Sequence, residues 1–178
     1  MQREQRALGL LNVVGGSAVL ASYAWSLSFS SELRGGLWGG VPPSLQPLYT
    51  TNMLLAAVGY FPFTWLFLFR TTPRELEAAT GVRYALLFAL YGLVLIPSAL
   101  WLPLTASLLQ SPGLLLWWSI RGVLGLVGLG SLGIVWLTFR YAKARPGPAG
   151  WAAAIGSLPF FTQTALLDAL VWPAFYPI

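Results

Sequence analysis

The sequence predicts an all-α integral membrane protein, a single domain (residues 1–178) folded as a bundle of five transmembrane helices. The chain is 57% hydrophobic and only 8% charged, whereas about a quarter of the residues of a soluble domain are charged. Five separate stretches contain the roughly 20 mostly apolar residues that a membrane-spanning helix needs. Basic residues, moreover, concentrate in alternate connections. These three observations exclude an ordinary water-soluble domain.

Each predicted span ends at residues that break helices. Gly and Pro crowd the first connection (30–49), which is the largest, and the third connection is a tight turn at Ser111–Gly113. The five spans are expected at 7–29, 50–69, 84–109, 114–139 and 151–172.

The distribution of basic residues predicts the orientation of the bundle. Eight lie at the amino terminus or in the second and fourth connections: Arg3, Arg6, Arg70, Arg74, Arg83, Arg140, Lys143 and Arg145. The other connections hold only Arg34. The positive-inside rule then places the N-terminus in the cytoplasm and the C-terminus outside, as an odd number of spans requires. We expect the first span to be an uncleaved anchor and the location to be a bacterial-type cytoplasmic (inner) membrane.

Arg121 and Asp168 are the only charged residues deep within the predicted spans. At about 1.5 Å rise per residue, each should lie roughly 6 Å inward of an outer tryptophan, Trp117 or Trp172. A charge facing lipid is costly, so we expect an intramembrane salt bridge between the two. Two alternatives remain: the pair only fixes the register of two helices, or Arg121 extends outward to the lipid headgroups.

Helical spacing suggests which faces meet. Thr164 and Ser157 share a face with Asp168, whereas Gln163 is expected to project from another side towards the first, second or third span. In the fourth span Gly122, Gly125, Gly130 and Gly133 fall in one broad arc. Small residues allow close helix packing, so we expect this arc to face a neighbouring helix or a partner subunit.

Other features indicate an internal pocket. Pro62, Pro97 and Pro159 lie inside spans, and each removes a backbone donor and favours a kink. Asn52 and Tyr60 lie on roughly one side of the second span, while Trp38 lies in the first connection, which is expected to cover the mouth of the bundle. Most remaining Trp and Tyr residues are expected in interfacial belts.

The residue types present argue against catalysis. The chain has no Cys and no His, which removes thiol nucleophiles, imidazole bases and the usual zinc sites. No nucleotide-binding or hydrolase motif is present. A role other than catalysis is therefore favoured, the sequence does not identify a cofactor, and the scattered basic residues predict no nucleic-acid partner.

The first connection resembles that of the tryptophan-rich sensory protein (translocator protein) family through Trp38, Pro42 and Pro43. The resemblance covers about a tenth of the chain, while loop charge and the aromatic pattern of the fifth span differ. It implies five spans that bind a porphyrin or a sterol within the bundle.

The leading functional prediction is the binding of a hydrophobic or amphipathic small molecule, or a lipid, in an outward-facing intramembrane pocket. One alternative is a non-catalytic accessory subunit that packs against partner membrane subunits through the Gly-rich fourth span. Next come a small solute or ion transporter and, last, a lipid-modifying enzyme. The candidate ligand-binding residues are Arg121, Asp168, Gln163, Thr164, Asn52, Tyr60 and Trp38.

Overall fold

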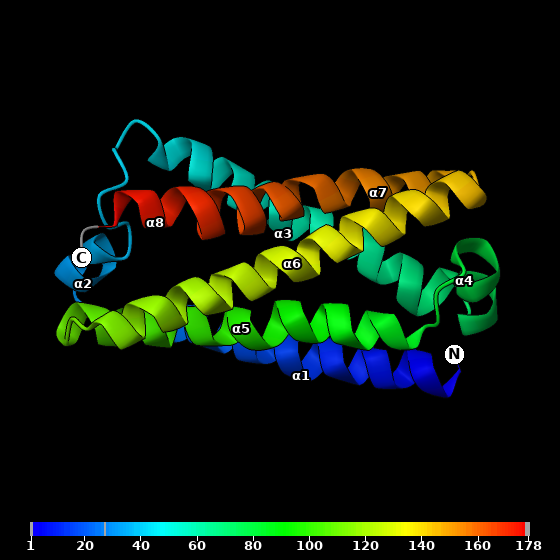
Figure 1. Ribbon diagram of the computed structural model, residues 1–178, viewed down its shortest axis with the longest axis horizontal. Coiled ribbons are helices and arrows are strands. Elements are labelled where there is room, and N and C mark those ends of the chain that lie inside the picture. The colour runs from blue at the N-terminus through cyan, green and yellow to red at the C-terminus, as the bar shows by residue number, and fades with distance from the viewer. Residues whose placement is uncertain (1, 27, 177–178) are drawn as a thin grey trace.

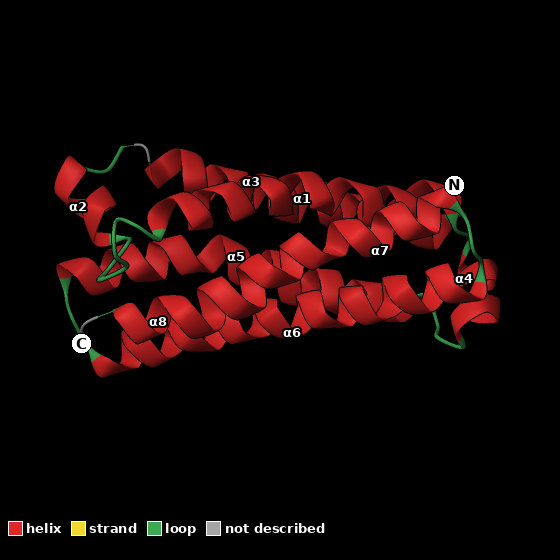
Figure 2. Ribbon diagram, turned by 90° about the horizontal axis from the view of Figure 1, so that it is seen from above, coloured by secondary structure: helices red, strands yellow, loops and turns green. Residues whose placement is uncertain are grey.

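The computed structural model describes residues 2–26 and 28–176, which form helices and no strand (Figures 1 and 2). Five long helical segments are apolar and long enough to cross a membrane. The predicted fold class is therefore confirmed. The segments are α1 (Arg3–Ser26); α3 (Gln46–Trp65) with its continuation η1 (Leu66–Arg70); α5 (Ala85–Gln110); α6 (Leu114–Ala144); and α7 (Pro148–Phe161) with its continuations η2 (Thr162–Val171) and α8 (Trp172–Phe175).

The long helices pack in an order that differs from their order in the chain. α5 packs against α1 and α6, and α7 packs against α6 and α3. The two marked ends of the chain lie at opposite ends of the bundle (Figure 1). The short helices α2 (Ser31–Gly36) and α4 (Pro73–Thr80) lie at those opposite ends, α2 beside the C-terminal end and α4 beside the N-terminal end.

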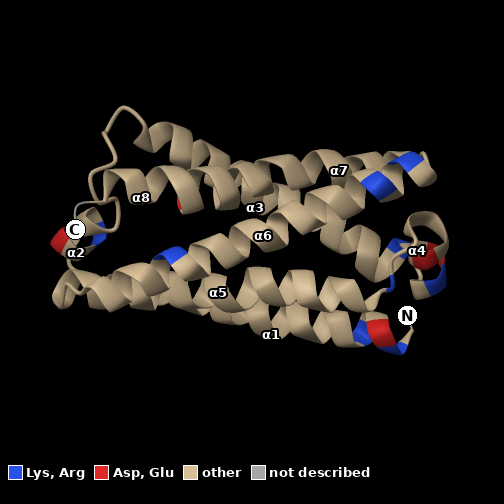
Figure 3. Ribbon diagram, in the orientation of Figure 1, with Lys and Arg blue, Asp and Glu red and all other residues tan. Residues whose placement is uncertain are grey.

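The charged residues segregate along the bundle axis. Figure 3 shows that most Lys and Arg residues lie at the end that holds the N-terminus and α4. α6 has 31 residues and is therefore about 46 Å long, longer than the roughly 30 Å hydrocarbon layer. Its last turns, with Arg140 and Lys143, extend into this basic end, which we call the inner end.

The second connection is fixed by specific contacts at the inner end. Thr72 and Glu75 form a reciprocal capping box at the start of α4, and Gly81 ends the helix with φ +69°. The hydrogen bonds from Thr72 lower the pKa of Glu75, and Arg145 lies 3.5 Å from the Glu75 carboxylate. This exposed pair joins α4 to the end of α6.

α3 and α7 cross at a point of very close backbone approach. A Cβ added to Gly59 would lie 2.2 Å from the Gly156 carbonyl oxygen, and one on Gly156 would lie 2.9 Å from that of Gly59. Small residues are the usual means by which membrane helices come so close. Pro62 and Pro159 follow the crossing, and a π-helical segment begins within four residues after each of them. The expected irregularity at these prolines thus takes the form of π-helix.

Two apolar clusters fill the bundle. The inner cluster is built around Phe63, Phe67 and Tyr91, and the outer one around Trp117, Ile120 and Trp172. The candidate site lies in the outer half, where α1, α3, α5, α6 and η2 surround a cavity.

Candidate functional site in the outer half of the bundle

The predicted salt bridge between Arg121 and Asp168 is not formed. No ion pair joins them in the described part of the chain. The exposed Arg121 lies instead on its own helix surface, with its guanidinium carbon 5.9 Å and 5.3 Å from the ring centroids of Trp117 and Trp118. Cation–π contact with these rings and exposure at the surface of the bundle accommodate this charge without a carboxylate. The similar depth of Arg121 and Asp168 in their predicted spans was a poor guide to pairing, because depth does not determine the direction in which a side chain points.

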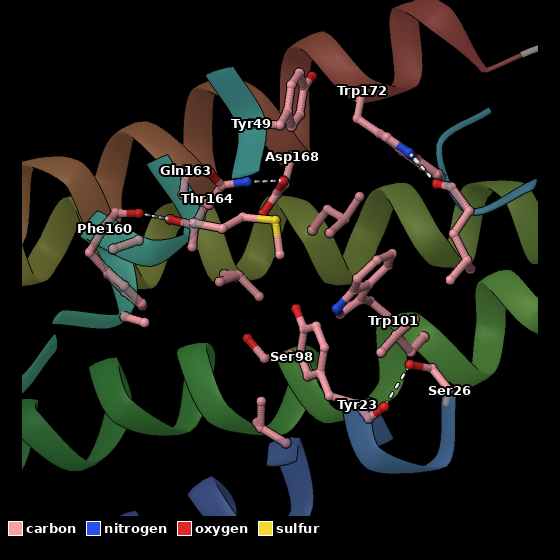
Figure 4. Close-up of a pocket in the computed structure, with 18 of the residues that line it drawn as sticks. Tyr23, Ser26, Tyr49, Ser98, Trp101, Phe160, Gln163, Thr164, Asp168 and Trp172 are labelled. Carbon is pink, nitrogen blue, oxygen red and sulfur yellow. Dashed lines mark hydrogen bonds between the residues drawn. The ribbon is translucent and has the colours of Figure 1, made fainter. Parts of the chain in front are cut away.

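Asp168 instead faces a cavity of about 640 Å³ (Figure 4). This volume falls within the range of small-molecule sites, about 300–1,000 Å³. Most of the wall is apolar, including Val19, Leu102, Leu124 and Val127. The cavity therefore combines an apolar volume with one carboxylate.

A chain of amides holds that carboxylate in place. Gln163 Nε2 donates a 2.8 Å hydrogen bond to Asp168 Oδ1. Asn52 Nδ2 on α3 donates to Gln163 Oε1 at 3.0 Å and to the Pro159 carbonyl at 3.1 Å. Because Gln163 accepts at its oxygen and donates at its nitrogen, the orientation of its amide is determined.

The backbone of η2 makes this arrangement possible. In an α-helix, residues five apart point about 140° away from each other. A π-helix bonds residue i to i+5, which brings residues 163 and 168 towards the same side. Gln163 was expected on a different face because an α-helix was assumed.

Polar groups also lie on the opposite wall. Figure 4 shows Tyr23 of α1 with Ser98 and Trp101 of α5 across the cavity from Asp168. Tyr23 packs edge-on against Trp101, with centroids 6.3 Å apart. Tyr49 lies beside Asp168 (Figure 4) and donates from its hydroxyl to the Leu167 carbonyl at 3.1 Å.

The first connection covers the outer mouth, and contacts with the C-terminal segment hold it there. Trp172 Nε1 donates to the Leu37 carbonyl at 3.0 Å, and Gly40 N donates to the Phe175 carbonyl at 2.8 Å. Arg34, Leu37 and Trp38 thereby reach the cavity wall. A Cβ on Gly40 would lie 2.2 Å from the Phe175 oxygen, so this contact requires glycine.

Part of the cavity wall is exposed on the lateral surface of the bundle, where α1 and α3 lie. Leu20 is 71% exposed and Leu54 is 65% exposed, yet both line the cavity. α1 packs chiefly on α5, and α3 packs chiefly on α7. In a bilayer, the boundary between α1 and α3 would thus place the cavity next to acyl chains.

The structure brings four of the seven predicted residues to the cavity wall: Asp168, Gln163, Thr164 and Trp38. Asn52 lies behind them as the support of Gln163. Arg121 lies on the exposed surface of α6 and does not line the cavity. Tyr60 lies in the inner half, donating to Asn12 Oδ1 at 2.6 Å and packing 5.1 Å from the Phe63 ring.

The small and polar residues of α6 and the fifth span serve mainly in packing. Thr164 Oγ1 lies 2.8 Å from Ser131 Oγ, and Ser157 Oγ lies 3.1 Å from Thr138 Oγ1. The predicted polar face of the fifth span therefore does contact α6.

The expected glycine arc divides between different surroundings. A Cβ on Gly130 would meet the Leu90 carbonyl and Val94 of α5 at 3.0 Å, and Gly133 also faces Leu90. Gly122 and Gly125 face open space. Gly128, outside the arc, is the glycine that approaches η2, at Ala165.

Several cavity residues were missed from the sequence: Tyr23, Arg34, Tyr49, Ser98, Trp101, Phe160 and Trp172. Tyr49, Trp101 and Trp172 were expected in interfacial belts, but Tyr49 and Trp172 are buried. By contrast Trp65, Trp118, Trp136 and Trp151 are exposed, as a belt requires. The i, i+3 spacing of Ser98 and Trp101, two polar-tipped residues on one face, was an available signal.

Within the described residues no three Asp or Glu side chains gather into a group that could hold a metal ion. Comparisons of the chain with protein-family models, with curated proteins and with solved structures found no match.

Proposed function

We propose that this protein binds a hydrophobic or amphipathic small molecule, or a lipid, in an outward-facing cavity within the membrane. The observation that carries the proposal is the cavity of about 640 Å³ with Asp168 in its wall. Binding sites of this kind are mostly apolar with a few well-placed polar groups. Asp168, held by Gln163, supplies such a group.

The surroundings of the cavity support a ligand that arrives from the bilayer. The exposed Leu20, Met53 and Leu54 frame the boundary between α1 and α3, so an acyl or other apolar chain meets only apolar atoms there. The wall that contains Asp168 would hold the more polar end. The basic inner end would face the cytoplasm by the positive-inside rule, in a bacterial-type inner membrane.

A pair of matched substitutions tests this proposal. Ala57→Phe adds a large side chain in the exposed part of the cavity wall, where it should obstruct a ligand, whereas Ala152→Phe adds the same side chain at an exposed position outside the cavity. Both proteins would be purified in mild detergent, and copurifying lipids and small molecules would be measured by native mass spectrometry. We expect a bound species in the parent protein and in Ala152→Phe, and its loss in Ala57→Phe.

Equal occupancy in all three proteins would contradict the proposal. A chain that is unstable unless another membrane protein copurifies with it would favour an accessory subunit instead. Gly122 and Gly125, which face open space on α6, are the surface on which such a partner would be sought.

A further inference from the structure

We propose that the ligand is a lipophilic amine, which binds with its ammonium group between Asp168 and the aromatic walls of the cavity. This inference rests on the proposed binding function and specifies the chemical class of the ligand. It is carried by the free acceptor capacity of one carboxylate and by the composition of the wall around it.

The carboxylate of Asp168 is only partly engaged by the protein. Oδ1 accepts the hydrogen bond from Gln163, whereas no donor to Oδ2 is found among the described residues, and no cationic side chain forms an ion pair with this group. A buried charge is normally paired or extensively hydrogen-bonded. An ammonium group would supply both the charge and the missing donors.

The wall around Asp168 also has the composition of a cation site. Six aromatic residues line the cavity: Tyr23, Trp38, Tyr49, Trp101, Phe160 and Trp172. Tyr49 lies next to Asp168, and Tyr23 and Trp101 lie on the facing wall (Figure 4). Ring faces attract a cation within about 6 Å, most strongly where water is excluded. The rings of Tyr23, Tyr49 and Trp101 thus flank the space that Asp168 faces.

The remaining charge in the wall is placed so that it does not oppose an ammonium group at Asp168. Arg34 belongs to α2 at the mouth, is exposed, and donates to the Phe29 carbonyl at 2.7 Å. Its charge is therefore screened by solvent and headgroups. An anionic ligand would instead bring a negative group against Asp168, which like-charge repulsion disfavours.

Three probes with the same apolar chain test the inference: dodecylamine, dodecanol and dodecanoate. Binding would be measured at neutral pH in nanodiscs of zwitterionic lipid, with empty nanodiscs as the correction for partitioning. We expect dodecylamine to bind about tenfold or more tightly than dodecanol, because charge-assisted hydrogen bonds and cation–π contacts together contribute more than one neutral hydrogen bond. Dodecanoate should bind most weakly.

Variants identify the source of that preference. Asp168→Asn keeps an oxygen that can accept from Gln163 but removes the charge, and we expect it to bring amine and alcohol to similar affinity. Trp101→Leu should weaken the amine more than the alcohol. Glu32→Gln removes an exposed outer carboxylate that does not line the cavity, and it should leave the preference unchanged.

Equal binding of amine and alcohol to the parent protein would overturn the amine inference and leave the cavity proposal standing. If none of the three probes binds, and if Ala57→Phe retains the same copurifying species as the parent protein, both the cavity proposal and the amine inference would be refuted. A tenfold preference that survives in Asp168→Asn would assign the cation to another site and would also overturn the inference.

Discussion

Gln163 and Asp168 form a 2.8 Å hydrogen bond between residues that an α-helix would separate. The π-helical segment Thr162–Val171 brings the two side chains together. π-helical turns are rare and frequently occur at functional sites. Here the turn directs an amide–carboxylate pair into an otherwise mostly apolar cavity.

Replacing Gln163 by Leu should destabilise the protein and weaken ligand binding. The change removes the donor to Asp168 and the acceptor of Asn52 Nδ2, whose other hydrogen bond, to Pro159, remains. We expect a loss of about 1–3 kcal/mol in the free energy of unfolding, measured by thermal unfolding in detergent. Gln110→Leu, at the exposed end of α5, is the control; a similar cost in both variants would argue against the amide chain.

Arg121 and Asp168 should behave as independent residues. Arg121→Asp and Asp168→Arg should combine additively within about 0.5 kcal/mol, as residues without contact do. Arg121→Gln should cost no more than about 1 kcal/mol, the value of an exposed cation–π contact. Thermal unfolding of the two single variants and the double variant checks this, and recovery of stability in the double variant would show that the ion pair forms after all.

The crossing of α3 and α7 should depend on glycine at position 59. Gly59→Ala places a Cβ 2.2 Å from the Gly156 carbonyl oxygen, and overpacking of this kind costs about 1–3 kcal/mol. Gly122→Ala is the matched control, since its Cβ meets nothing within 4 Å. That control should be neutral or gain up to about 1 kcal/mol from helix propensity. Equal midpoints of thermal unfolding for the two variants would refute the close crossing.

Single cysteines test the orientation of the bundle, because the chain contains none. Gly35 in α2 and Ala144 at the inner end of α6 are both exposed. By the positive-inside rule, a membrane-impermeant maleimide should label Gly35→Cys in intact cells. It should label Ala144→Cys only after permeabilisation. The reverse labelling pattern would show that the bundle has the opposite orientation.

The sequence predicted the fold class because a helix that crosses a membrane must consist mostly of apolar residues, and such stretches can be recognised from the amino-acid sequence. Five apolar stretches, separated by connections such as Ser111–Gly113, correspond to the five long helices. The ends were less well predicted: α1 begins at Arg3 and α6 continues to Ala144, because helices extend past the hydrocarbon layer into polar surroundings.

The sequence also singled out Asp168, Gln163, Thr164 and Asn52, because a polar group in an apolar span needs a partner or a function. It singled out Trp38 because this residue lies in the long first connection. It did not reveal their arrangement. The partner of Asp168 was expected on the neighbouring helix at matching depth, but depth alone carries no information about side-chain direction, and Arg121 points outward onto Trp117 and Trp118.

What the sequence alone determined is that the long helices are apolar enough to be surrounded by lipid and that there are five of them, because both follow from local composition and length. The tertiary structure decided which residues meet. The π-helix after Pro159 rotates Asp168 towards Gln163, and the packing order places Tyr23 and Trp101 opposite them. Such contacts depend on backbone geometry and on helices distant in the chain, neither of which appears in the spacing of residues along one helix.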